Sequence, residues 1–197
     1  MNTQAAILKT VLGIEVPLQH VNVNVDMEDL VSNVCVKQIY KNNEAVNIEA
    51  VYTFPLPSDA ALLHLTVELG NKTLTGVVVE KNKAEREYEE AITDGDTAIM
   101  LEQIESGLYS MNVGNLEAGE TAIISFTYGA LNKWKGEHLR FLLPTTLAPR
   151  YGSPEQAGLQ PHQVPQSSML IENKFSLSML VSGALADAEI DCPSHNV

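Results

Sequence analysis

The sequence is short of cysteine, of basic residues and of long apolar runs. Two cysteines in 197 residues, Cys35 and Cys192, are too few for a disulfide framework. The chain has 12 lysines and arginines but 25 acidic residues, which gives a formal net charge of −13. This charge disfavours binding to phosphate backbones and to anionic lipid surfaces. No stretch approaches the roughly 20 apolar residues that span a bilayer. We therefore expect no nucleic-acid binding and no membrane insertion.

The amino terminus also lacks a basic segment followed by an apolar one, so no secretory signal is visible. This absence predicts a cytoplasmic protein. Cys35 lies between two valines, which favours a buried, reduced thiol. A bridge between Cys35 and Cys192 is the alternative.

Motifs that carry known chemistry are missing as well. The chain has no nucleophile elbow, no Walker or dinucleotide glycine fingerprint, and its five histidines are scattered singly. Neither His-x-x-x-His nor Cys-x-x-Cys occurs, so a zinc site has no support. The acidic clusters at 26–29 and 94–97 fit solvated turns, and the second lacks the other ligands of a calcium loop. We expect no catalytic residue, no metal and no cofactor.

The feature present throughout is alternation of apolar and polar residues with a period of two. Valines 21, 23 and 25 alternate with polar residues, as a strand with one buried face requires. The pattern recurs at 46–54, 122–128 and 171–181. Many short strands separated by turn residues predict a mainly β protein, a sandwich of two antiparallel sheets.

Residues 62–79 fit a β-hairpin. Gly70-Asn71 is a two-residue turn whose positive φ angles match the twist of the flanking strands. Closing the strands at this turn places Val67 opposite Leu74 and Leu63 opposite Val78, with both pairs on one face.

One segment, about 82–94, predicts a short α-helix. Asn82 is the expected N-cap, with Glu85 at the spacing of a capping box, and Gly95 is the expected C-terminal cap. Apolar residues form one stripe along it: Ala84, Tyr88, Ala91 and Ile92. Since the helix is short, packing of this stripe on a sheet must stabilise it.

Two exposed features are candidate interaction surfaces. The charged face of the helix carries Glu85, Glu87 and Glu89, which either bind a basic partner or are simply solvated. Trp134 lies between two lysines and is either a binding residue or a cross-strand packing residue. Free strand edges and the segment after Tyr151 are further candidates, because exposed edges invite strand addition.

Several short motifs, in order, carry a resemblance to a known family. They lie at 16–18 (Val-Pro-Leu), 38–42 (Gln-Ile-Tyr-Lys-Asn), 48–57, 80–94, 111–116, 140–145 and 148–151. Together they resemble the VIT domain, the vault protein and inter-alpha-trypsin inhibitor heavy chain domain. The resemblance covers about residues 10–151 and is strongest to bacterial proteins of the von Willebrand factor A domain-containing protein 5 type. It implies a β-sandwich, placed ahead of an A domain, that contributes no catalytic residues and binds proteins.

The resemblance divides the chain into a VIT domain at 1–151, a Pro- and Gln-rich loop at 152–168, and final strands at 169–197. Those strands either complete the sandwich or lead to an A domain. The Asp-x-Ser-x-Ser string of that domain's metal site does not occur here. Cys192-Pro193-Ser194-His195 resembles the Ser-Pro-Ser-His stretch that precedes the A domain in relatives. We therefore expect a fragment from which the A domain is absent.

The leading functional prediction is a non-catalytic protein–protein interaction module that works beside an A domain of the same polypeptide. One alternative is an architectural spacer that only orients the A domain. A second is an enzyme with an unrecognised site, which would need a pocket holding several of His20, His64, Asp26 and Asp94.

Overall fold

The computed structural model describes residues 4–5, 7–10, 16, 18–77, 79–96, 98–144, 146–147 and 174–193. The loop predicted at 152–168 and the start of the last predicted strand, 171–173, lie outside the described residues. The strands are β1 (Gln4–Ala5), β2 (Ile7–Thr10), β3 (Leu18–Glu28), β4 (Val31–Lys41), β5 (Ile48–Pro55), β6 (Ala61–Leu69), β7 (Lys72–Thr75), β8 (Ile99–Glu105), β9 (Leu108–Leu116), β10 (Thr121–Leu131), β11 (Lys133–Lys135), β12 (His138–Arg140), β13 (Thr146–Leu147) and β14 (Lys174–Ser182). Helix α1 spans Lys81–Thr93 and the short 3-10 helix η2 spans Gly183–Leu185.

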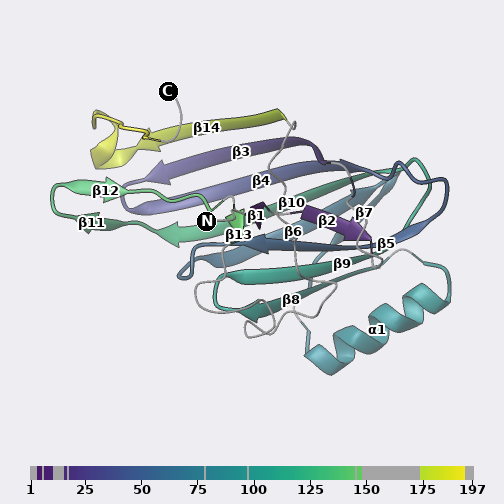
Figure 1. Ribbon diagram of the computed structural model, residues 1–197. Helices are drawn as coiled ribbons and strands as arrows, with labels where there is room; N and C mark the ends of the chain where they lie inside the picture. The colour runs from purple at the N-terminus through teal and green to yellow at the C-terminus, as the bar shows by residue number, and fades with distance from the viewer. Residues whose placement is uncertain are drawn as a thin grey trace.

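Two sheets form the body of the molecule (Figure 1). A six-stranded sheet has the order β14-β3-β4-β10-β6-β7, and a four-stranded sheet has the order β2-β5-β9-β8. Two-stranded pairs, β11–β12 and β1–β13, complete the described strands. The predicted mainly β sandwich with one short α-helix is confirmed.

One pairing departs from the antiparallel arrangement. β14 runs parallel to β3, with Phe175 opposite Val21 and Met179 opposite Val25. A tight hairpin would force antiparallel pairing, whereas the long connection that precedes β14 allows the chain to return in either direction. Alternation of apolar residues reveals which face of a strand is buried, but it does not encode the direction of its neighbour.

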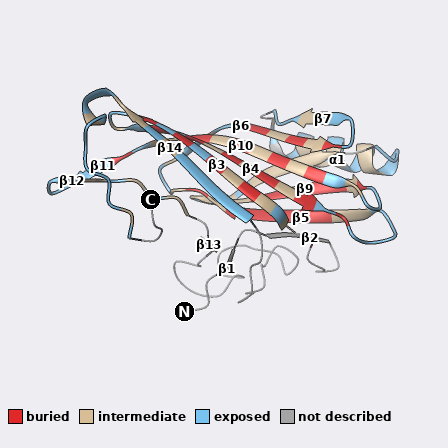
Figure 2. Ribbon diagram, turned by 90° about the horizontal axis from the view of Figure 1, so that it is seen from above, coloured by how far each residue is buried: buried red, intermediate tan, exposed pale blue. Residues whose placement is uncertain are grey.

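The core lies between the two sheets, and β3, β4 and β10 show the buried stripes that alternation predicts (Figure 2). The buried stripe predicted from the alternation over 171–181 is wrong for the described part of β14, where Phe175 and Leu177 are exposed at the edge of the sheet. Phe54 of β5 stacks on Tyr52 at a ring-centroid distance of 4.9 Å and on Phe126 of β10 at 4.6 Å, so one aromatic cluster joins both sheets. Tyr109 of β9 extends this stack, with its ring 5.6 Å from that of Phe54. Val46 was predicted to begin the alternating pattern at 46–54, which forms β5. It precedes that strand, however, and is exposed.

The hairpin predicted at 62–79 forms as β6 and β7, with its turn at Gly70 and Asn71. Val67 pairs with Leu74, as predicted. β7 ends at Thr75, however, which is shorter than the alternation implied. The predicted partner of Leu63, Val78, lies outside the described residues.

Helix α1 begins one residue before the predicted start, and the predicted N-cap is wrong. Glu80 is the N-cap, and its carbonyl accepts hydrogen bonds from the N–H groups of Lys83 and Ala84 at 3.0 and 2.9 Å. Because helical bonding already starts at Glu80, Asn82 lies inside the first turn, and no side chain caps this end. The predicted C-terminal cap is confirmed: Gly95 has φ +82° and donates to the carbonyl of Ile92 at 3.1 Å.

No helix in the described part of the chain has the length and the apolar character to cross a membrane.

Candidate interaction surfaces

Helix α1 packs its apolar stripe on the four-stranded sheet through a glycine. A Cβ atom at Gly114 of β9 would overlap Ile92 Cδ1 and would lie 3.1 Å from the hydroxyl of Tyr88. Ala84, Tyr88 and Ile92 are all half-buried, as the predicted stripe requires. A side chain at this position would require the Ile92 side chain or the helix to move, so the glycine allows the close packing seen here.

Tyr88 is a half-buried polar group of the helix. Burial raises its pKa to about 12, and the charge of Glu49 on β5 adds to the shift. The phenol therefore stays neutral at physiological pH and serves as a packing residue of the helix.

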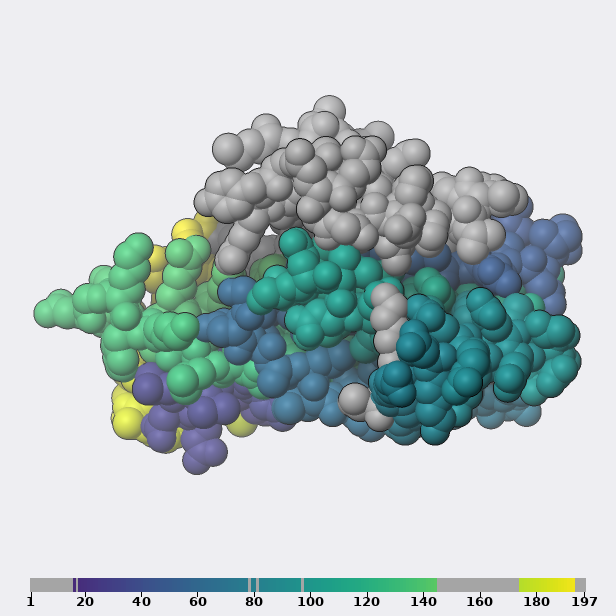
Figure 3. Space-filling view, turned by 90° about the horizontal axis from the view of Figure 1, so that it is seen from below, coloured from purple at the N-terminus to yellow at the C-terminus, as the bar shows by residue number. Residues whose placement is uncertain are grey.

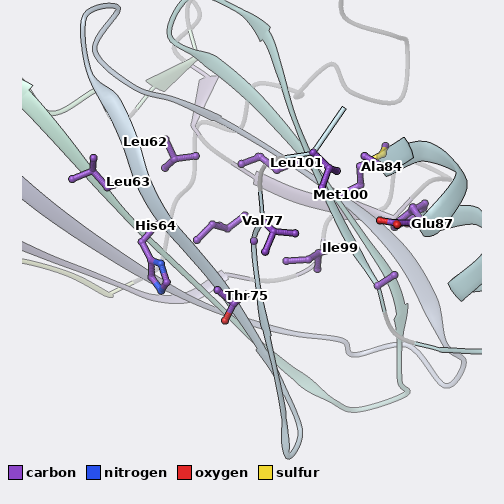
Figure 4. Close-up of a pocket in the computed structure, with 15 residues that line it drawn as sticks. Leu62, Leu63, His64, Thr75, Val77, Ala84, Glu87, Ile99, Met100 and Leu101 are labelled. Carbon is purple, nitrogen blue, oxygen red and sulfur yellow. The ribbon is translucent and has the colours of Figure 1, made fainter. Parts of the chain in front are cut away.

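A groove opens beside the helix, with a cavity volume of about 410 Å³. It lies between β6, the segment that follows β7, α1 and β8 (Figure 4). We call it the α1–β8 groove, and its lining residues are 62–65, 75–77, 79, 84, 87, 88 and 98–101. Most of these side chains are apolar, and the polar ones, including His64 and Glu87, are few, as is common in ligand-binding clefts.

Two large apolar side chains of the groove are exposed to solvent. Leu63 is 62% exposed and Val77 is 78% exposed. Single exposed apolar residues are common, whereas exposed apolar residues grouped on one concave surface make that surface a candidate interaction site. This feature was not visible in the sequence, because the alternation predicts a strand that continues beyond Thr75 and pairs with Leu63.

β8 contributes a free backbone edge to the groove. It is the terminal strand of its sheet, and among the described residues only β9 pairs with it. The carbonyl of Ala98 accepts a hydrogen bond from the N–H of Gly114 at 3.0 Å. Because bonded pairs alternate along an antiparallel ladder, the N–H and C=O groups of Ile99 and Leu101 point toward the unpaired edge.

The surroundings of the groove are acidic. Nine acidic and three basic residues fall between Glu80 and Glu105, so this segment carries −6 of the total charge of −13. Glu87 lines the groove itself, with its carboxylate 3.6 Å from Lys83 Nζ.

Of the three predicted helix residues, only Glu87 faces the groove. Glu85 is half-buried and Glu89 is exposed, and neither lines the cavity. The predicted acidic face is therefore divided: one residue faces the groove and the other two lie elsewhere on the helix.

Trp134 lies on the β11–β12 hairpin, at the end of the molecule opposite α1 (Figures 1 and 3). It is 53% exposed and pairs across the hairpin with Leu139. Lys133 Nζ contacts Asp59 Oδ2 at 2.7 Å, which anchors the hairpin to the body and lowers the pKa of Asp59. Three basic residues and one acidic residue fall within 133–140. Trp134 and the helix glutamates therefore belong to two separate surfaces.

The four residues of which an enzyme pocket would hold several are dispersed. His64 lines the groove, whereas His20 and Asp26 lie on the solvent face of β3 in the six-stranded sheet, and Asp94 follows α1. His20 Nε2 lies 2.9 Å from Asn22 Oδ1 on that same strand. No group of three potential metal ligands occurs among the residues that the structure describes.

A two-sheet sandwich with a surface groove and one packed helix defines a β-sandwich domain. Residues 18–128 match the family model of the Vault protein inter-alpha-trypsin domain, so this chain belongs to the VIT family, as its motifs predicted.

Known relatives extend the match beyond the family model. The chain is 32% identical over 172 residues to von Willebrand factor A domain-containing protein 5A of Rattus norvegicus, which covers 85% of this chain and 21% of that protein. It is 34% identical over 139 residues to the same-named protein of Homo sapiens, covering 69% of this chain and 18% of that protein. It is also 34% identical over 142 residues to Protein mono-ADP-ribosyltransferase PARP4 of Homo sapiens, covering 72% of this chain and 8% of that protein. The chain thus spans about a fifth or less of the length of these relatives.

Proposed function

We propose that this chain is a non-catalytic protein–protein interaction module that works beside a von Willebrand factor A domain. The observation that carries the proposal is the α1–β8 groove, where exposed apolar side chains meet an unpaired strand edge. Such a surface fits another polypeptide better than it fits a reacting small molecule, because it offers a backbone edge and apolar contacts rather than converging acids and bases.

The relatives support both parts of the proposal. The names of the rat and human proteins include a von Willebrand factor A domain. The transferase activity in the name of the third relative belongs to a protein of which this chain matches only 8%. A binding role beside other domains fits both kinds of relative.

The architectural spacer is the second candidate, and the β11–β12 hairpin favours it. This hairpin lies at the same end of the sandwich as η2 (Figure 1). A domain that followed in the same polypeptide would leave from this end of the sandwich, where the β11–β12 hairpin offers a surface that could orient it.

A capture experiment with matched variants separates the two candidates. The full chain, its Leu63→Glu variant and its Leu131→Glu variant are each immobilised and exposed to extract of the source cells. Leu63 and Leu131 are similarly exposed, at 62% and 57%, but only Leu63 lines the groove. An interaction module loses its bound proteins with Leu63→Glu and keeps them with Leu131→Glu. A spacer captures no protein, or it captures the same proteins whether the unmodified chain or either variant is immobilised.

A further inference from the structure

We infer that the α1–β8 groove takes an extended peptide segment of another protein, which adds to β8 as a fifth strand and alternates aliphatic with basic side chains. This inference rests on the proposed function and names the chemistry of the partner. It is built from the direction of the backbone groups, the two faces of β8 and the charge around the groove.

The backbone of β8 provides the means of attachment. Ile99 and Leu101 direct their N–H and C=O groups away from β9, toward the side on which the groove opens. A peptide that lies along this edge satisfies these groups and extends the four-stranded sheet. β8 has no proline, and its seven residues give a pairing length of an ordinary strand.

The two faces of β8 predict the alternation in the peptide. Ile99 and Leu101 pack against the hydrophobic core, so a neighbouring strand places every second side chain beside them, across the groove from Leu63. Aliphatic residues fit these positions. The intervening side chains lie beside Met100 on the other face, where α1 presents Glu87.

The negative charge around the groove determines which charge the intervening residues of the peptide should carry. The segment around the groove carries −6, so lysine or arginine in the peptide is attracted and acidic residues are repelled. A second copy of this chain is a poor occupant for the same reason. Antiparallel pairing of β8 with its own copy would bring two acidic segments together, including Glu102 and Glu105 of each.

The test uses a synthetic peptide that alternates valine with lysine over the length of β8, with a terminal fluorophore, and measures binding to the full chain by fluorescence anisotropy. Two modified peptides carry N-methyl groups on the valine amides or on the lysine amides. In a strand, the amides of one set face β8 and those of the other set face solvent. Strand addition therefore predicts that methylating one set weakens binding by at least about tenfold, while the other set binds almost unchanged.

Matched protein variants locate the peptide. Leu63→Glu should weaken peptide binding severalfold and Leu131→Glu should leave the affinity unchanged, although both positions are exposed. Glu87→Gln should weaken binding by roughly threefold, and Glu89→Gln, on the same helix outside the groove, should have no effect. Added salt should weaken binding to the unmodified chain.

Three results overturn the inference. They are failure of the valine–lysine peptide to bind, equal binding of the two methylated peptides, and an affinity for the peptide that Leu63→Glu leaves unchanged. The capture experiment above distinguishes the failure of this inference from failure of the proposed function. If proteins are captured through Leu63 but the peptide fails, the groove binds proteins by another geometry. If both fail, the interaction module itself is wrong.

Discussion

The two ends of this sandwich differ in charge and in how they are built. At one end α1 and β8 border an acidic, apolar groove, and at the other a basic hairpin presents the only tryptophan of the chain (Figure 1). The groove combines segments that are distant in the sequence, β6, α1 and β8, whereas the hairpin is one continuous segment. The first surface therefore depends on the tertiary fold and the second mainly on local sequence.

Loss of the central aromatic cluster should have the largest effect, because this cluster lies in the core and joins the two sheets. Phe54→Ala removes a ring that stacks on Tyr52 and Phe126, and we expect the free energy of unfolding to fall by about 3–5 kcal/mol. Trp134→Ala is the matched aromatic truncation at the exposed hairpin. It should change the free energy of unfolding by less than about 0.5 kcal/mol. Urea denaturation followed by circular dichroism measures both. Equal costs would mean that the hairpin is part of the core.

A smaller substitution should damage the groove end alone. In Gly114→Ala the new methyl group overlaps Ile92, so either the Ile92 side chain leaves its rotamer or α1 shifts, at a cost of about 1–3 kcal/mol. In Gly129→Ala the new methyl group lies 3.5 Å from Leu63 Cδ1, an ordinary contact, and this variant is the control. The emission maximum of Trp134 should not change in either variant. A shift of that maximum in Gly114→Ala would show that the two ends are coupled.

The smallest effect should come from the ion pair at the hairpin end. Lys133 lowers the pKa of Asp59, so this pair stabilises the fold above the ordinary Asp pKa of about 3.9, and the contribution is lost as pH falls through the lower folded-state pKa. Both side chains are substantially exposed, so the contribution is below about 1 kcal/mol. Acidification should lower the fluorescence anisotropy of Trp134 as the hairpin loosens. Asp59→Asn should remove that pH dependence, and its persistence in Asp59→Asn would assign it to another group.

The difference between the ends also explains what the sequence could predict. Alternation along β3 and the glycine after α1 are local signals, and both predictions are confirmed. The N-cap at Asn82 is wrong because backbone bonding to Glu80 begins the helix earlier, which side-chain preference does not reveal. The exposure of Leu63 depends on where β7 ends, and the parallel pairing of β14 depends on a long-range return of the chain. Neither is contained in a local pattern.

Of the predicted surface residues, Glu87 and Trp134 lie on the two exposed surfaces, and no signal in the sequence separated Glu87 from its neighbours on the helix. Helical spacing places Glu87 and Glu89 on different sides of α1, but only the position of Gly114 in β9 determines which side meets the groove. A sequence shows which residues share a helix face, whereas the packing partner of that face comes from the fold.

The central claim is that this VIT domain binds proteins through the α1–β8 groove, with β8 as the strand that accepts the partner. Hydrogen–deuterium exchange of the full chain, with and without the valine–lysine peptide, tests it most directly. We predict slower exchange of the Ile99 and Leu101 amides, which point to the free edge, and no change at residues 133–140. Protection confined to the β11–β12 hairpin, with β8 exchanging as before, would contradict the account.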